Sequence, residues 1–285
     1  MRDLLMMAIL SSCLAVPACN RDGETDDRSL SFLDRSQPVA TRTSEDLTRS
    51  IEPVQVEVFE PHQRMKMAFE ALPFQQVLDD VYGRIWRERE AIVFTCRDGY
   101  ESTIAVRRIL SHSAFLALSR LGQKEFTIVD ARHGAPREVS LGPFFVIWEN
   151  LDDAKIRAED DYGWPYQVVG IELVSFDQRF GRMVPDREAS KRIWAGFDAF
   201  TIHCSRCHAI NGQGGSVGPE LNYPANPTEY MKKGWLRRWI DDPTSMRRDP
   251  AMPPLNRNLP ERDRVIEDIV QYLEAIASHK VEPSR

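Results

Sequence analysis

The sequence lacks an excess of positive charge. Its 285 residues include 37 Lys and Arg against 43 Asp and Glu, a formal net charge of −6 at pH 7. A general nucleic-acid-binding protein is usually basic, so no nucleic-acid partner is expected. Sequence repeats of useful length are also absent. Hydrophobic residues make up 42% and charged residues 28%, an ordinary balance for a globular protein of one large or two modest domains.

Long apolar runs are nearly absent as well. Residues 4–16 form the one sustained run, which is short for a transmembrane helix of about 20 apolar residues. Small residues and then abruptly polar sequence follow it, a pattern typical of an export signal that is cleaved before Cys19. We therefore predict that residues 1–18 are an export signal and that the protein is periplasmic.

Cys19 would be the first residue after this cleavage, a position that resembles the lipidated cysteine of a bacterial lipoprotein. A lipid on Cys19 would attach the protein to a bacterial membrane. Two alternatives remain open. Cys13 also fits the lipoprotein pattern, although with a very short apolar core before it, and a plain cleaved signal would leave Cys19 as an ordinary thiol.

Cysteine is scarce, with only five residues in the whole chain. Two lie in the leader region, Cys96 stands alone, and Cys204 and Cys207 belong to one short motif. An exported protein with an even set of spaced cysteines would suggest disulfides. This distribution predicts no disulfide framework.

The remaining sequence divides into three parts. Residues 19–52 are rich in Asp, Arg, Ser and Thr with little apolar periodicity, so we predict a flexible tether. Residues 53–185 alternate short apolar runs with helical spacing, which is typical of an α+β domain. We expect helices within 69–86 and 104–121, and strands at 54–58, 91–94, 126–129, 144–148 and 168–174.

Residues 186–285 are predicted to form a small all-α domain. Helical spacing of apolar residues is found before the cysteine motif, at residues 193–200, and again at residues 236–240. A third stripe follows Pro260 and runs to Ile276. The predicted fold class is therefore α+β, with an N-terminal mixed domain followed by a helical one.

The motif of Cys204, Cys207 and His208 has the C-x-x-C-H spacing of haem c attachment. Two intervening residues place both thiols on one turn, where each can add to one porphyrin vinyl group, and the adjacent imidazole can then bind the iron. A structural zinc site would need a second Cys or His pair, and His279 is the only later histidine. A thioredoxin-type pair would follow a strand and open a helix, whereas a helix is expected before this motif.

A sixth iron ligand is expected downstream of the motif. A methionine thioether is a soft donor that favours reduced iron, and the candidates are Met231, Met246 and Met252. Prolines flank Met252 at positions 250, 253 and 254 and would hold a non-helical backbone there. We predict Met252 as the axial ligand, with Met246, a histidine or an open position as alternatives.

Because they contain both the attachment motif and the Met252 segment, residues 189–279 resemble a class I monohaem cytochrome c domain over its full length. Gly196 resembles the small residue at which that family's first helix crosses its last, and Tyr272 would be its aromatic partner. Gly218, Pro219 and Leu221 resemble the family's Gly-Pro-x-Leu. The resemblance implies that the Pro219 carbonyl accepts a hydrogen bond from the proximal imidazole, which fixes its tautomer.

A second resemblance covers residues 65–178, which are similar to the latter half of the sulfite-oxidase-type molybdopterin fold. It is carried by the segment from Phe94 to Ile104 and by short motifs such as residues 141–146 and 164–167. The pterin-binding half with the metal-ligating cysteine has no counterpart in this chain, and Cys96 lies in another position. Bound molybdopterin is therefore not expected, and Cys96 is expected to be a buried thiol at the end of a strand.

Taken together, these features predict an electron-transfer cytochrome with one covalent haem c, a carrier or subunit of a redox chain. Neither a general base nor a nucleophile stands out, so catalysis is not expected, and the upstream domain would serve docking. The basic residues Lys232, Lys233, Arg237 and Arg238 would steer an acidic redox partner. Two alternatives are an oxidoreductase subunit whose upstream domain binds or oxidises a small oxyanion, and a haem-based sensor.

Overall fold

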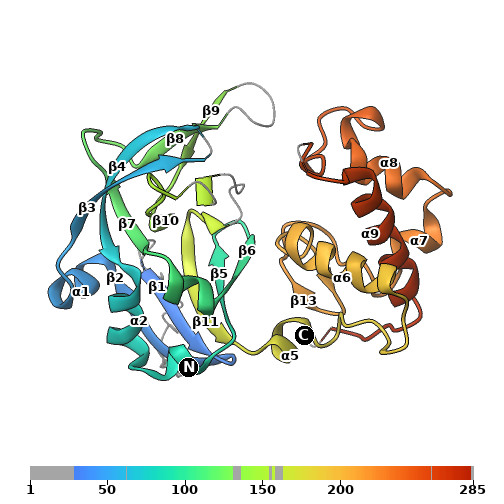
Figure 1. Ribbon diagram of the computed structural model, residues 1–285, viewed down its shortest axis with the longest axis horizontal. Helices are drawn as coiled ribbons and strands as arrows, with labels where there is room; N and C mark the ends of the chain where they lie inside the picture. The colour runs from blue at the N-terminus through green and yellow to red at the C-terminus, as the bar shows by residue number, and fades with distance from the viewer. Residues whose placement is uncertain are drawn as a thin grey trace, which may run out of the picture.

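A computed structural model describes residues 29–61, 63–130, 136–153, 156–157, 163–257 and 259–283. The chain forms a strand-rich N-terminal domain and a helical C-terminal domain, joined through the short helix α5, Phe176–Phe180 (Figure 1). The predicted α+β class is confirmed. Residues 1–28, with the expected export signal, Cys13 and Cys19, lie outside the described residues.

The N-terminal domain contains two main sheets. The first has the strand order β2-β1-β11-β5-β6 and the second the order β10-β7-β4-β3, with a separate hairpin of β8 and β9. Their bounds are β1 Ser29–Asp34, β2 Gln37–Thr43, β3 Val54–Glu60, β4 Met65–Pro73, β5 Ala91–Cys96, β6 Glu101–Ala105, β7 Ala114–Arg120, β8 Thr127–Asp130, β9 Arg137–Ser140, β10 Phe145–Trp148 and β11 Val168–Val174. All five predicted strands are present, within a few residues of their expected bounds.

The core of this domain is continuous and aromatic. Trp86, Trp148 and Trp164 are fully or almost fully buried in it, together with a cluster of phenylalanines. Helix α2, Phe74–Tyr82, contributes Phe74, whose ring lies 5.4 Å from that of Phe94 on β5. Short helices η1, Ile85–Glu88, and α3, Val106–Ser111, complete the domain.

The flexible tether predicted for residues 19–52 is wrong over the described part of that segment. β1 pairs in parallel with β11, and β2 pairs back onto β1. Helix α1, Ser44–Ser50, follows with a capping box at Thr43. Leu30 and Leu47 are fully buried. A few well-spaced apolar residues suffice because the sheet already supplies a strand edge and a hydrophobic surface, although the local composition resembles that of a disordered segment.

The helix expected within residues 69–86 is confirmed as α2, and the helix expected within 104–121 is corrected. Residues 69–86 divide into the end of β4 and helix α2, with Pro73 between them. Residues 104–121 contain β6, the one-and-a-half-turn helix α3 and β7. Burial alternates along β4 and β6. However, β6, α3 and β7 follow one another almost without a break, so their apolar residues together can be read with helical spacing as easily as with strand spacing.

The C-terminal domain is built on two long helices, α6, Lys191–His203, and α9, Arg262–Ile276. They cross at Gly196, where an added Cβ would lie 1.9 Å from the carbonyl oxygen of Asp268. The Tyr272 ring lies 5.7 Å from Phe197 and 5.4 Å from Phe200. Gly196 and Tyr272 therefore occupy the helix crossing, as predicted from the sequence.

Shorter elements surround these helices. They are α7 Pro227–Tyr230, α8 Trp235–Asp241, η3 Pro243–Ser245, and the two-residue strands β12 Ala209–Ile210 and β13 Gln213–Gly214. The domain is thus mainly helical rather than all-α, because a small hairpin follows the cysteine motif. Within the part of the chain that the structure describes, no helix is both long and apolar enough to cross a membrane.

Candidate haem site

The cysteine motif begins where α6 ends. The amide of Cys204 donates to the Phe200 carbonyl at 2.9 Å, which completes the helix. The chain then turns tightly, because the amides of Cys207 and His208 both donate to the Cys204 carbonyl, at 3.1 and 2.9 Å. One turn therefore brings together the two thiols and the imidazole that the sequence predicts as a haem attachment motif.

His208 is held by the loop that follows the motif. Its Nδ1 lies 2.8 Å from the Pro219 carbonyl oxygen, the residue that the sequence assigns to this contact. Burial lowers the pKa of His208, and the Pro219 contact opposes this more weakly. The ring is therefore neutral at pH 7, with its proton on Nδ1 and Nε2 left as a donor for a metal.

Gly218 explains how the loop can approach the imidazole so closely. A Cβ at this position would lie 2.3 Å from His208 Cε1 and 2.6 Å from Nδ1. The Gly218 amide also donates to the Cys207 carbonyl at 2.7 Å. Any larger residue would push the loop away from the ring, so this close approach requires glycine.

Both thiols of the motif are free, and burial raises their pKa values. The pKa of Cys204 rises to about 12, mainly through desolvation, while the nearby Arg206 opposes the shift. The thiols thus stay protonated at neutral pH. Cys204 packs against the hydrophobic cluster of the C-terminal domain, which is the kind of surface that a porphyrin face requires.

Met252 packs against that same cluster and is half-buried. Just after it, the Leu255 amide donates to the Ile240 carbonyl at 3.1 Å. Arg262 donates to the carbonyls of Leu255 and Asn256 at 3.0 to 3.2 Å. The irregular segment around Met252 is therefore tied to α8 and α9 rather than loose.

A buried amide network between the motif and α9 was not predicted from the sequence. Asn211, Asn222 and Asn226 are fully buried. Asn222 donates to Asn211 at 3.0 Å and Asn226 donates to Asn222 at 3.0 Å. The Glu220 carboxylate accepts from four backbone amides, at 2.8 to 3.2 Å. The sequence feature that could have predicted this network is the set of three asparagines in a Gly- and Pro-rich loop. In such a loop, buried side-chain amides can form hydrogen bonds with backbone groups that have no partner in a helix or sheet.

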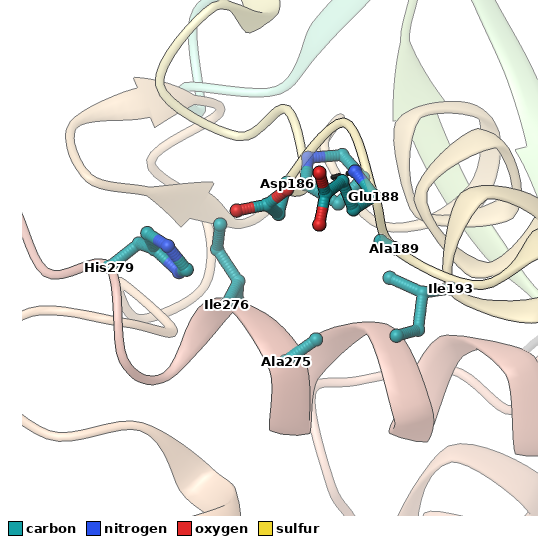
Figure 2. Close-up of a pocket in the computed structure, with 8 residues that line it drawn as sticks. Asp186, Glu188, Ala189, Ile193, Ala275, Ile276 and His279 are labelled. Atoms are coloured by element: carbon teal, nitrogen blue, oxygen red, sulfur yellow. Dashed lines mark hydrogen bonds between the residues drawn. The ribbon is translucent and has the colours of Figure 1, made fainter.

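His279, the later histidine considered as a zinc or iron ligand, lies elsewhere. It lines a pocket with Asp186, Glu188 and Ile276 (Figure 2), and none of the four predicted haem-binding residues lines that pocket. Its Nδ1 lies 3.0 Å from Ser278 Oγ. The structure therefore does not bring His279 together with the cysteine motif.

The predicted docking residues lie on and before α8. Lys232, Lys233 and Arg238 are exposed. The Lys232 ammonium lies 5.1 Å from the centre of the Trp235 ring, and Arg237 pairs with Asp263 at 2.8 Å. We call Lys232, Lys233, Arg237 and Arg238 the α8 basic surface. The Asp263 carboxylate partly offsets the positive charge of the α8 basic surface at Arg237.

The comparison with protein families decides the identity of this domain. Residues 193–277 match the cytochrome c family. The chain thus carries a C-terminal cytochrome c domain, which supports an electron-transfer haem protein and implies covalent haem c. None of the curated proteins compared with the chain matches it.

The family match does not extend to the N-terminal domain. The resemblance of residues 65–178 to the sulfite-oxidase-type fold receives no support from it and stays a prediction. Cys96 is 5% exposed at the end of β5, and burial raises its pKa. The expectation of a buried thiol at a strand end is confirmed.

Proposed function

We propose that the cytochrome c domain is of class I and carries one haem, attached as thioethers at Cys204 and Cys207 with His208 as the proximal ligand. The contact between His208 Nδ1 and the Pro219 carbonyl carries this proposal. It leaves Nε2 available and holds the imidazole in one orientation, and it also strengthens the imidazole as a donor. The haem supplies an iron that alternates between ferric and ferrous states.

Met252 is the proposed sixth ligand. It shares a hydrophobic cluster with Cys204, and its segment is anchored through Leu255 and Arg262. A sulfur donor favours the ferrous state and excludes water from the iron. Both effects suit a carrier that exchanges single electrons without catalysing a reaction.

The cellular setting of this carrier is also proposed. The leader of residues 1–18 supports export to the periplasm, and a lipid at Cys19 would hold the protein at a bacterial membrane. The first described strand begins at Ser29.

An acidic redox protein is the proposed partner, and the α8 basic surface is its docking site. Exposed charges accelerate encounter by long-range attraction that salt screens. Replacing Lys233 and Arg238 by Glu should slow electron transfer severalfold at low salt and flatten its salt dependence. Replacing the distant exposed Lys66 by Glu is the control, and unchanged rates in the α8 variant would contradict this docking site.

Haem attachment itself is tested by solvent extraction. The full protein would be matured in an exporting bacterium with a working cytochrome c assembly system. Acidified organic solvent should leave haem on the wild-type protein, and the Cys204→Ala, Cys207→Ala variant should have lost covalent haem. Cys96→Ala is the matched control and should retain it. Extraction of all haem from the wild-type protein would contradict the proposal.

A further inference from the structure

The N-terminal domain contacts the haem attachment turn directly. The Glu101 amide donates to the Arg206 carbonyl at 2.9 Å, and the Ser216 amide donates to the Gly99 carbonyl at 3.1 Å. Arg206 Nη1 also donates to the Tyr100 hydroxyl at 3.1 Å. These contacts come from the turn between β5 and β6, at the edge of the N-terminal domain that lies towards the cytochrome c domain (Figure 1).

The linker helix α5 stabilises the contact between the two domains. Arg179 is 8% exposed and donates to Glu101 and to Thr103 on β6, at 2.6 and 3.0 Å. On its other side, the Phe176 ring lies 6.2 Å from Phe197 on α6. The two domains are thus joined both by their linker and by the β5–β6 turn, which favours one fixed arrangement over free movement.

Arg206 places a permanent positive charge inside the attachment motif. It stands between the two cysteines in sequence, and its charge opposes the burial that raises the pKa values of Cys204 and Cys207. Its Nε donates to the Ile202 carbonyl at 2.9 Å. One end of the guanidinium is therefore fixed by α6 and the other by Tyr100, and the Tyr100 ring packs against the core of the N-terminal domain.

A positive charge held at the attachment turn would favour the reduced state of a haem bound there, because oxidation adds one positive charge to the haem. Asp98 in the same turn carries the opposing charge and acts on Cys207. The Asp98 carboxylate accepts from the Tyr100 amide at 2.9 Å. Loss of the Tyr100 hydroxyl leaves that backbone contact in place, so it alters the position of Arg206 without removing Asp98.

We propose that Tyr100 is a positioning residue which holds the Arg206 cation at the haem attachment turn, so that the N-terminal domain raises the reduction potential of the haem. The proposal rests on haem attachment at Cys204 and Cys207 as proposed above. The N-terminal domain is then an electrostatic part of the haem site, which is a different role from the docking module that the sequence suggests.

The test is a redox titration of the full, haem-loaded protein and its variants. Tyr100→Phe removes the hydroxyl that accepts from Arg206 Nη1 and, by loosening the position of this charge, should lower the equilibrium constant for haem reduction roughly threefold, about 28 mV at 59 mV per tenfold for one electron. Arg206→Gln removes the charge altogether and should lower the equilibrium constant for haem reduction roughly tenfold relative to wild type. Tyr82→Phe is the matched control, because it removes a hydroxyl that bonds the Leu33 and Ile171 carbonyls in the same domain.

The double variant separates positioning from a merely structural role. In the Arg206→Gln background, Tyr100→Phe should cause no further change in potential, because no charge remains to be positioned. An unchanged potential in Tyr100→Phe overturns the proposal, and so does an equal shift in both backgrounds. Absence of covalent haem from the wild-type protein would instead contradict the proposed function on which this inference rests.

Discussion

His208 Nδ1 lies 2.8 Å from the carbonyl oxygen of Pro219, eleven residues further along the chain. This contact fixes both the tautomer and the orientation of an imidazole whose pKa is lowered by burial. The loop can come this near only because Gly218 has no side chain. The proximal side of the proposed haem site is therefore organised by backbone, with little dependence on flexible side chains.

Gly218→Ala should disrupt this arrangement. The new methyl group would lie 2.3 Å from His208 Cε1, so the loop must withdraw and the Pro219 contact must lengthen. We expect a reduced yield of haem-loaded protein and a Tm lower by several degrees, both read from the Soret band during heating. Gly234→Ala is the control, because its surroundings are open and only its φ of +79° is strained. Equal losses in the two variants would contradict the role of Gly218.

Met252→Ala should remove the sixth ligand while leaving haem covalently bound. The weak near-infrared band of sulfur-to-iron charge transfer should disappear from the oxidised protein, and the reduction potential should fall because the soft donor is lost. Met246→Ala is the matched control and should keep the band. Retention of the band in Met252→Ala together with its loss in Met246→Ala would move the axial ligand to Met246.

Leu30→Ala should destabilise the N-terminal domain by about 2 to 5 kcal/mol, the usual cost of a cavity at a fully buried leucine. Leu30 lies on β1 and is fully buried. Val39→Ala on β2 removes a side chain that is 46% exposed and should cost little. Chemical denaturation followed by tryptophan fluorescence measures both. If Leu30→Ala were neutral, the segment would behave as the flexible tether suggested by its composition.

Asp34 should give this segment a pH-dependent stability. Arg89 donates to its carboxylate at 2.9 and 2.6 Å, and this hydrogen-bonded pair lowers the pKa of Asp34 in the folded protein. A carboxyl with a lowered pKa stabilises the fold above its unfolded pKa of about 3.9 and loses that contribution as pH falls through the folded value.

Asp34→Asn should therefore lower the free energy of unfolding by about 1 kcal/mol at pH 7. The difference from wild type should shrink in acid below pH 4 or so, where the carboxyl of the unfolded chain is already protonated. Urea denaturation at several pH values measures this. Asp80→Asn, which removes an exposed carboxylate from α2 and leaves Arg89 untouched, is the control. A difference that stays constant from pH 7 into strong acid would contradict the ion pair.

Much of the haem site follows from local sequence. Cys204, Cys207 and His208 fall on one turn wherever the chain places them, since two intervening residues set the spacing. Pro219 and Met252 could be assigned through their resemblance to a known family. The helix crossing at Gly196 was also predictable through this resemblance. The physical basis is that a small residue on one helix lets another helix come close.

Other features depend on residues far apart in sequence. The parallel pairing of β1 with β11 joins residues about 140 positions apart, so composition alone made the first strands look like a tether. Likewise, nothing local to Arg206 indicates Tyr100, 106 residues away. Local sequence determined the chemistry of the attachment motif because adjacent residues share one turn. Only tertiary structure decided what surrounds that turn, because packing of the sheet and the linker helix brings the two domains together.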